Sequence, residues 1–221
     1  MADEPLSSGP YTLMRALQED VWAALPEGLE PPDLELRRGF LLDHVEPGQS
    51  VLDAGCGEGA FTALLADAGA APVGVDIAER ALERARARHP ALDFRLAPED
   101  GPLAFDDASF DVVWASEVLA HVGDTARFVS ELRRVLRPRG RLLVTTPYHG
   151  RVKNAALALT RFEAHFDPRG PQLRFYTPRS LRALLLDFGF EQVQVRSAGG
   201  PPLARRLILA VARRAPVALG G

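Results

Sequence analysis

After Gly48 the chain alternates between short apolar runs and segments whose apolar residues recur every three or four positions. Short apolar runs favour buried strands, and the second spacing favours amphipathic helices. The apolar runs predict strands at residues 50–53, 72–76, 92–96, 110–115 and 141–146. The helical spacing predicts helices at 60–68, 78–88 and 125–136, and Pro138 and Gly140 end the last of these.

This alternation has a direct consequence for the fold class. Strands that alternate with helices predict crossover connections, and therefore an α/β fold with a mostly parallel sheet and helices on both faces. Ligands of such sheets bind beyond the carboxyl ends of the strands, at the point where the strand order reverses. The residues that directly follow each strand are therefore the first candidates for a functional site.

The segments before and after this core have a different pattern. Residues 6–25 and 32–45 have helical spacing, so we predict a helical lead-in or cap at 1–47, followed by one domain at 48–221. Beyond the fifth strand the alternation stops, and we predict an insertion around 148–176 that covers the substrate pocket.

The last third of the chain completes the expected sheet. The insertion contains a predicted helix at 152–159 and an irregular loop at 165–175. Thr177 is a favourable cap for a helix that ends at Gly189, because a hydroxyl side chain caps helix N-termini and glycine terminates helices. The two remaining apolar patterns predict strands at 190–196 and 207–212.

The sharpest motif is VLDAGCGEGAF at 51–61, in which three glycines stand between a predicted strand and a predicted helix. Glycine allows positive φ, and the absence of a Cβ lets a ligand approach the backbone closely. The N-terminus of the following helix offers unpaired N–H groups to an anion such as a carboxylate. Asp53, at the tip of the strand, can accept hydrogen bonds from an ammonium group.

Carboxylates also follow the second and third predicted strands. Asp76 ends the second strand, where a carboxylate can accept hydrogen bonds from both hydroxyls of a ribose. Ile77 would then lie against one face of an adenine ring. Glu99 or Asp100, after the third strand, could accept a hydrogen bond from the adenine amino group. The fourth strand ends at Ser116, in the same crevice.

A second interpretation of the glycine motif remains open. Gly55, Gly57 and Ala60 match the Gly-x-Gly-x-x-Ala fingerprint of a dinucleotide site, with Asp76 as the ribose acid, which would indicate an NAD(P)-dependent oxidoreductase. Three features argue against it. The charge of Asp53 would lie near a pyrophosphate, the chain has no room for a separate catalytic domain, and the segment 110–122 is left unexplained.

Five segments, in this order and at this spacing, resemble the class I S-adenosylmethionine-dependent methyltransferases: 51–59, 73–77, 97–105, 109–122 and 132–147. Together they cover nearly half of the chain. The sequences EVLAHV and LLVTTP also resemble the quinone and small-molecule O-methyltransferase branch of that family. The resemblance implies S-adenosyl-L-methionine as the cofactor. It also implies a Rossmann-like sheet of seven mostly parallel strands, with the last strand antiparallel beside the fifth.

The resemblance further implies which residues bind the cofactor. They are Asp53, Gly55, Gly57 and Gly59 for the methionine portion, Asp76 and Ile77 for the ribose and adenine, Glu99 or Asp100 for the adenine amino group, and Ser116 for the sulfonium side. The family usually has an acid followed by an alanine before the fourth strand, and Pro98 and Pro102 make this pair difficult to locate here. The adenine contact is therefore open between the two neighbouring acids.

Methyl transfer from a sulfonium is an in-line displacement, in which the protein mainly aligns the nucleophile, the methyl group and the sulfur. An oxygen nucleophile can also require a base, and the ordinary histidine pKa of about 6.5 suits that role. His121 follows the fourth strand and His149 follows the fifth, so both are candidate bases. For each of them, packing beside the ligand is the alternative. Tyr148 could position an acceptor hydroxyl.

Composition limits the ligands and the location. Hydrophobic residues make up 47% and charged residues 25% of the chain, as in ordinary globular proteins. Cys56 is the single cysteine, so an internal disulfide and a thiolate zinc site are excluded, and we predict no metal. The acidic N-terminus does not resemble a secretory signal, and no apolar run reaches the ~20 residues of a membrane span. We therefore expect a cytoplasmic protein without stable membrane insertion.

Charge is unevenly distributed along the chain. The net charge is −3, but the first 150 residues are acidic and residues 151–221 are basic. Arg151, Lys153, Arg161 and Arg174 lie in or near the predicted insertion, which favours an anionic small-molecule acceptor. No Asn-Pro-Pro-Tyr motif follows the fourth strand, so we expect no nucleic-acid substrate. The sequence leaves the oligomeric state and the methylated atom open.

Overall fold

A computed structural model describes residues 12–99, 102–148, 150, 159–160 and 172–216. In this part of the chain, seven strands form one sheet in the order β3-β2-β1-β4-β5-β7-β6. Their bounds are β1 Ser50–Ala54, β2 Ala71–Asp76, β3 Asp93–Leu96, β4 Phe110–Ser116, β5 Leu136–Pro147, β6 Phe190–Ala198 and β7 Leu207–Arg214. β7 is antiparallel to both neighbours, and the remaining neighbours are parallel. The predicted fold class, with its antiparallel last strand beside the fifth, is confirmed.

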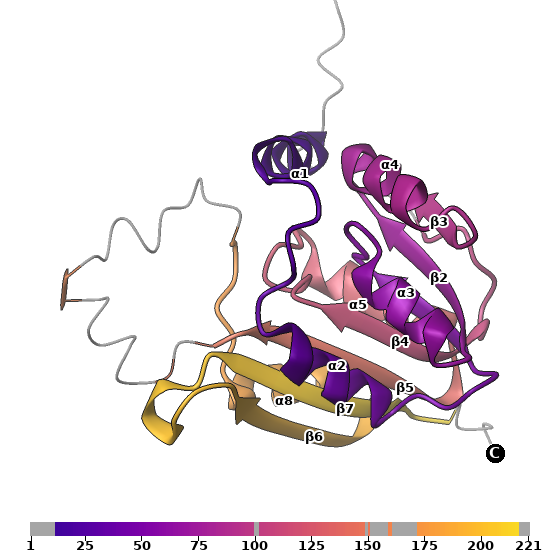
Figure 1. Cartoon of the computed structure of the whole chain (residues 1–221). Helices are drawn as coiled ribbons and strands as arrows, with labels where there is room; N and C mark the ends of the chain where they lie inside the picture. The colour runs from indigo at the N-terminus through magenta and orange to yellow at the C-terminus, as the bar shows by residue number, and fades with distance from the viewer. Residues whose placement is uncertain (1–11, 100–101, 149, 151–158, 161–171, 217–221) are drawn as a thin grey trace, which may run out of the picture.

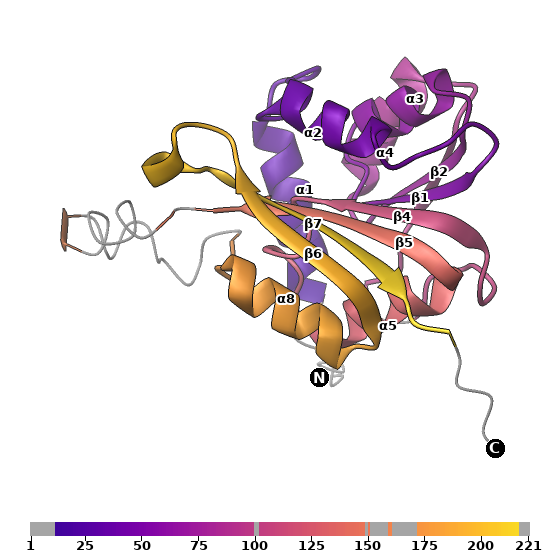
Figure 2. The same cartoon turned by 90° about the horizontal axis from the view of Figure 1, so that it is seen from below.

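Helices cover both faces of this sheet. Figure 2 shows α2, α3 and α4 on one face and α5 and α8 on the other, while α1 lies beside α4 (Figure 1). The helix bounds are α1 Thr12–Ala24, α2 Leu34–Leu42, α3 Ala60–Asp67, α4 Glu79–Arg88, α5 Thr125–Val135 and α8 Pro178–Asp187. The helices after the glycine loop and after β2 and β4 begin within a few residues of their predicted positions.

Strand β4 shows why the central strands are apolar at nearly every position. Val113 and Ala115 pack into the core on the α5 and α8 face, whereas Val112 and Trp114 pack into the core on the α2 and α3 face. The Trp114 ring is fully buried, with the Phe61 ring 5.3 Å away between centroids. A parallel strand with both faces covered loses the polar alternation of a half-exposed strand.

Strand β5 begins earlier than the sequence pattern predicts. The prediction starts the strand at 141, but the structure pairs Leu136 with Phe110 and shifts the register before Val112. Arg139 has φ 65° at this irregularity. The Pro138–Gly140 segment is therefore a bulge inside an extended strand, where the sequence suggested a turn between a helix and a strand.

The expected cap and insertion are described only in part. α1 and α2 lie within the two predicted lead-in helices. The predicted helix at 152–159 lies almost wholly outside the described residues, as does most of the predicted loop at 165–175. Gln172–Thr177 has no regular secondary structure, and Thr177 caps α8 with its hydroxyl, 3.1 Å from the Ser180 N–H. The division into a cap and a domain remains a prediction.

Candidate functional site

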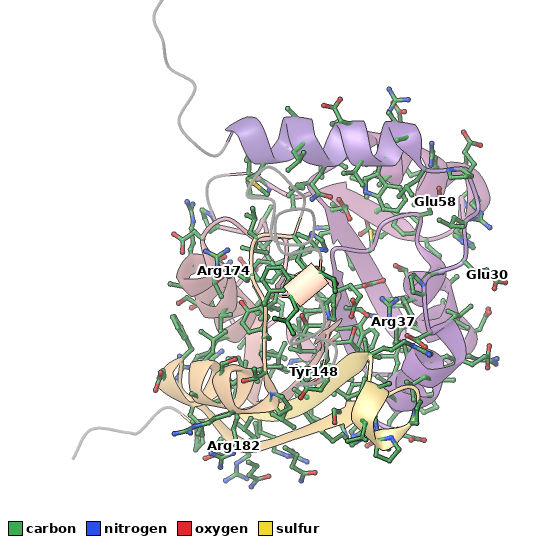
Figure 3. The ribbon with its side chains drawn as sticks, turned by 90° about the vertical axis from the view of Figure 1, so that its left-hand side faces the viewer. Glu30, Arg37, Glu58, Tyr148, Arg174 and Arg182 are labelled. Atoms are coloured by element: carbon green, nitrogen blue, oxygen red, sulfur yellow. The ribbon has the colours of Figure 1, made fainter. Side chains whose placement is uncertain are left out.

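A cavity of about 560 Å³ lies at the sheet edge where the carboxyl ends of β1, β2 and β4 meet. The strand order reverses between β1 and β4, so this is the position that the fold class favours for a ligand. Figure 3 looks onto this edge, with Arg37 and Glu58 on the side of α2 and the glycine loop, and Tyr148 and Arg174 across from them.

The cavity brings together most of the residues that the sequence selected. Seven of them line it: Gly55, Gly57, Asp76, Ile77, Glu99, Ser116 and His121. Asp53 and Gly59 are not among the lining residues. Asp100 and His149 lie outside the described residues, so their assignments stay predictions.

The glycine loop is tightly packed against other parts of the chain. Gly55 has φ 77°, and a Cβ there would lie 2.2 Å from a methyl carbon of Val118. Gly57 has φ 54°, and its Cβ would lie 2.9 Å from the Trp22 ring. The N–H of Gly55 already donates to Val75 O, and that of Gly57 to Asp76 Oδ2. These two amides are therefore used within the protein, and a ligand carboxylate needs a further donor.

Asp76 ties the second strand to the loop and to α4. Its Oδ2 accepts from the N–H of Gly57, and its Oδ1 accepts from the N–H of Ala78, both at 3.0 Å. Burial raises the pKa of Asp76, and these backbone N–H groups oppose that rise. Each carboxylate oxygen keeps further acceptor capacity, so the group can hold the loop and a ribose diol together.

Asp53 lies beneath the loop and not on the cavity surface. It is 1% exposed, and its Oδ2 accepts a hydrogen bond of 2.7 Å from the Thr62 hydroxyl. Burial raises the pKa of Asp53 from 3.8 to about 7, and the nearby charge of Asp76 adds to the rise. The sequence assigned Asp53 to an ammonium group of the ligand, and that assignment stays a prediction.

The raised pKa of Asp53 predicts a pH dependence of stability. The folded chain holds this proton up to about pH 7, whereas the unfolded chain releases it near pH 4. The stabilisation is therefore fully present below about pH 4 and is lost as the pH rises through 7. We expect the free energy of unfolding of the wild type to fall by roughly 4 kcal/mol more than that of Asp53→Asn between these limits.

Denaturant unfolding of both proteins at a series of pH values measures this difference. The asparagine variant is the matched comparison, because its amide stays neutral and can still accept from Thr62. Parallel stability curves for the two proteins would mean that folding does not raise the pKa of Asp53.

Arg37 is a cavity residue that the sequence pattern did not single out. It comes from α2, is 4% exposed and lines the cavity. Its Nε and Nη2 donate to the Ser116 hydroxyl at 3.0 and 2.6 Å, and its Nη1 donates to Pro32 O at 3.0 Å. Its guanidinium carbon lies 4.8 Å from the centre of the Phe61 ring.

Among the described residues, no carboxylate oxygen lies within ion-pair distance of Arg37. Burial lowers the pKa of Arg37, and the nearby charges of Glu117, Asp53 and Asp33 oppose that fall. Its three hydrogen bonds go to neutral groups and leave two of its five N–H groups for a ligand anion. The sequence signal was the placement of Arg37 on the same helix face as Leu34 and Leu41.

Ser116 and Glu117 continue this polar cluster at the end of β4. The Ser116 hydroxyl lies 2.7 Å from the Thr145 hydroxyl, which donates to Glu117 Oε1 at 2.9 Å. Glu117 has φ 61°, a strained conformation for a residue with a side chain, and it lines the cavity. Burial raises the pKa of Glu117, and the charge of Arg37 opposes that rise.

The remaining predicted residues differ in their surroundings. Glu99 lines the cavity, and its Oε1 accepts from the backbone N–H of Arg15 at 2.8 Å. His121 also lines the cavity, in the turn after β4. Within the described part of the chain, no group of three or more His, Cys, Asp or Glu residues could hold a metal ion. No described helix has both the length and the apolar character needed to cross a membrane.

The donors and acceptors of this cavity fit the cofactor that the family resemblance implies. Arg37 provides cationic donors where a carboxylate can lie, at the β4 end of the cavity. Asp76 provides an acceptor for a ribose at the β2 end, and Glu99 provides one for an amino group after β3. The cavity therefore offers cationic donors at one end and carboxylate acceptors at the other. An adenosyl group joined to an amino acid requires this arrangement.

Comparison with known proteins agrees with this geometry. Residues 52–144 match the family described as a methyltransferase domain. A probable S-adenosylmethionine-dependent methyltransferase of Mycolicibacterium smegmatis is 45% identical over 106 residues, which are 48% of this chain and 41% of that protein. The ubiquinone biosynthesis O-methyltransferase of Thiobacillus denitrificans is 30% identical over 166 residues, which are 72% of this chain and 71% of that protein.

A solved structure has the same fold. Phosphoethanolamine N-methyltransferase 2 of Haemonchus contortus, in complex with S-adenosyl-L-methionine, matches with a TM-score of 0.68 at 15% identity, over 96% of this chain and 61% of that one. The chain spans half or less of the length of its mycobacterial relatives.

The comparisons and the topology do not support the oxidoreductase alternative. The usual dinucleotide-binding sheet has the order 3-2-1-4-5-6, whereas β7 stands between β5 and β6 here. The family match, the relative aligned over most of both chains and the cavity chemistry lead to one assignment. The chain belongs to the class I S-adenosylmethionine-dependent methyltransferases.

Proposed function

We propose that this enzyme methylates an oxygen atom of a small, largely apolar molecule. The observation that carries the proposal is the composition of the cavity beyond the expected cofactor residues. Beyond helix α1 and Leu25, which directly follows it, the apolar side chains that line the cavity include Leu29, Val118, Val122 and Phe128. An apolar wall with few polar groups binds a hydrophobic ring or chain and excludes water from the reacting atoms. The name of the Thiobacillus relative, a ubiquinone biosynthesis O-methyltransferase, supports an oxygen acceptor.

The chain's own residues mainly hold and orient the reactants in this proposal. Bound S-adenosyl-L-methionine supplies an activated methyl group on a sulfonium. Arg37 holds the cofactor's carboxylate, and Asp76 accepts hydrogen bonds from its ribose hydroxyls. Ser116 keeps Arg37 in place and lies at the sulfonium side. Holding an acceptor oxygen in line with the methyl group is the main contribution of the protein to such a displacement.

Two titratable groups could receive the proton of the acceptor hydroxyl. His121 and Glu117 both line the cavity near the end of β4. Both stay candidates for this role, and His149 stays a prediction outside the described residues.

An anionic acceptor remains part of the proposal. Arg127 lines the cavity, and Arg174 donates to the backbone carbonyls of Val122 and Gly123, which also line it. These cations lie near the apolar wall and would favour an acid group on the acceptor. Of the other basic residues that the sequence selected, Arg151, Lys153 and Arg161 lie outside the described residues.

A transfer assay with tritium-labelled S-adenosyl-L-methionine tests the acceptor. The enzyme is incubated with panels of quinols, phenols, aromatic carboxylic acids and amines of similar size, and the products are separated and analysed by mass spectrometry. We expect label in methyl ethers or esters, with Asp76→Ala as the inactive control. Label confined to amines or to carbon would contradict the proposed oxygen acceptor without affecting the family assignment.

A further inference from the structure

Helix α1 forms one side of the cavity, although it precedes the sheet in sequence. Figure 1 shows it beside α4, at the edge of the sheet that carries the site. Four residues on one face of α1 line the cavity at the spacing of a helical stripe, and Leu25 directly after the helix continues this stripe; the four are Met14, Gln18, Val21 and Trp22. The Trp22 ring lies directly over Gly57, where an added Cβ would come within 2.9 Å of it.

A carboxylate of α1 caps the helix that follows Asp76. The N-cap residue of α4 is Ala78, which has no side-chain oxygen for the first N–H groups of that helix. Glu19 supplies both oxygens from α1, accepting from the N–H of Glu79 at 2.6 Å and of Arg80 at 3.2 Å. Such orphan N–H groups are normally satisfied by a local cap, so α4 depends on α1 for its N-terminal hydrogen bonds.

The first turn of α1 is bound to the end of β3 in the same way. Glu99 Oε1 accepts from the N–H of Arg15 at 2.8 Å, and Arg15 Nη2 donates to Ala97 O at 3.0 Å. Glu99 is the residue that the sequence assigned to the adenine amino group. One of its oxygens is therefore occupied by α1, and the other keeps its acceptor capacity.

The segment after α1 is bound to the glycine loop. Glu58 Oε2 accepts from the N–H of Gly28 at 2.8 Å, and its side chain also pairs with Arg84 and Arg88 at 2.9 and 2.8 Å. The Glu58 side chain is 7% exposed, and Figure 3 shows it at the upper side of the site. Both ends of α1 are thus bound to loops that surround the expected adenosine position.

The cavity persists beneath α1 and reaches Asp76, Ile77 and Glu99 with the helix in place. A ligand on these residues is therefore enclosed by α1 and not displaced by it. We infer that α1 is a wall of the adenosine subsite, with Trp22 against the ligand, and that Glu19 and Glu99 hold this wall closed. Opening of these contacts then frees the adenosine end of the cofactor, so their strength slows its dissociation.

This inference rests on the cofactor and not on the proposed acceptor. Its test is the dissociation rate of S-adenosylhomocysteine, measured by stopped-flow displacement and followed by tryptophan fluorescence. We expect Glu19→Ala to accelerate dissociation about tenfold, in line with the loss of a helix cap. Asp20→Ala is the matched control, because it removes the same charge from an exposed position one residue along α1, and we expect the wild-type rate.

The fluorescence signal can be assigned to one residue. The chain has two tryptophans, and Trp114 is fully buried in the sheet core. Quenching by acrylamide therefore reports mainly on Trp22, and we expect S-adenosylhomocysteine to reduce it. In Trp22→Phe this ligand-dependent change should disappear.

A second variant keeps the test decisive if Glu19→Ala unfolds at the working temperature. Trp22→Ala leaves the hydrogen bonds of Glu19 and Glu99 in place, and calorimetry should show roughly tenfold weaker binding of S-adenosylhomocysteine. The inference is overturned if Glu19→Ala and Asp20→Ala release the ligand at the same rate, or if the ligand leaves Trp22 quenching unchanged. Absence of any binding to the wild type would instead contradict the cofactor assignment.

Discussion

Arg37→Met should weaken the binding of S-adenosylhomocysteine by about 100-fold, because removal of one partner from a desolvated charge pair costs at least ~2–5 kcal/mol. The side chain is 4% exposed, and within the described part of the chain its hydrogen bonds go to Ser116 and Pro32. The proposed carboxylate of the ligand would lose its cationic donors, while methionine would fill most of the space. Titration calorimetry measures the affinity directly.

Thermal unfolding of the same variant provides an independent readout. The variant loses three hydrogen bonds and the cation that stabilises the charged form of Glu117, so it should melt below the wild type without ligand. The increase in melting temperature on ligand addition should be lost in addition. The control is Arg38→Met, at an exposed neighbouring position on α2. Equal affinities for the two variants would show that Arg37 does not bind the ligand.

Asp76→Asn should also reduce affinity for S-adenosylhomocysteine by roughly 100-fold. Hydrogen bonds to a charged group contribute about 1.5–3 kcal/mol each, and the ribose diol offers two. The asparagine side chain has the same shape but replaces one acceptor oxygen by a donor, which opposes either the N–H of Gly57 or a ribose hydroxyl. Calorimetry with S-adenosylhomocysteine measures the loss.

Two comparisons make the Asp76 result specific. Asp67→Asn changes an exposed aspartate at the end of α3 and should bind as the wild type does. S-inosylhomocysteine, which lacks the adenine amino group but keeps the ribose, should suffer the same relative loss with Asp76→Asn. A loss confined to the adenine ligand would place Asp76 at the base and contradict its assignment to the ribose.

The predictions from the sequence agree with the structure for features that depend on neighbouring residues. The three glycines of 51–61 predicted a strand, a loop and a helix, and the structure has β1, the loop and α3 there. Asp76 was found because it directly follows a strand, and all parallel strands present that end to one edge. The order of strands around β7 came from the family resemblance, since periodicity does not specify which strands are neighbours.

Two candidate site residues make contacts that neighbouring residues in the sequence do not reveal. Asp53 precedes the glycines, and its buried side chain accepts a hydrogen bond from Thr62. Glu99 lines the cavity, and one of its oxygens binds the backbone of α1, 84 positions away in sequence. Their assignments to the ligand stay predictions. Which way a carboxylate at a strand end points depends on the helix that packs above it.

The sequence by itself determined the α/β sheet, the glycine loop and the acidic strand ends, because periodicity and glycine act within a few residues of the chain. Only the tertiary structure decided that Arg37 meets Ser116 and that α1 covers the loop. Those contacts join residues far apart in sequence, and they depend on how amphipathic helices dock against the sheet. A helical pattern shows which face of a helix is buried, but it does not show which partner that face will meet.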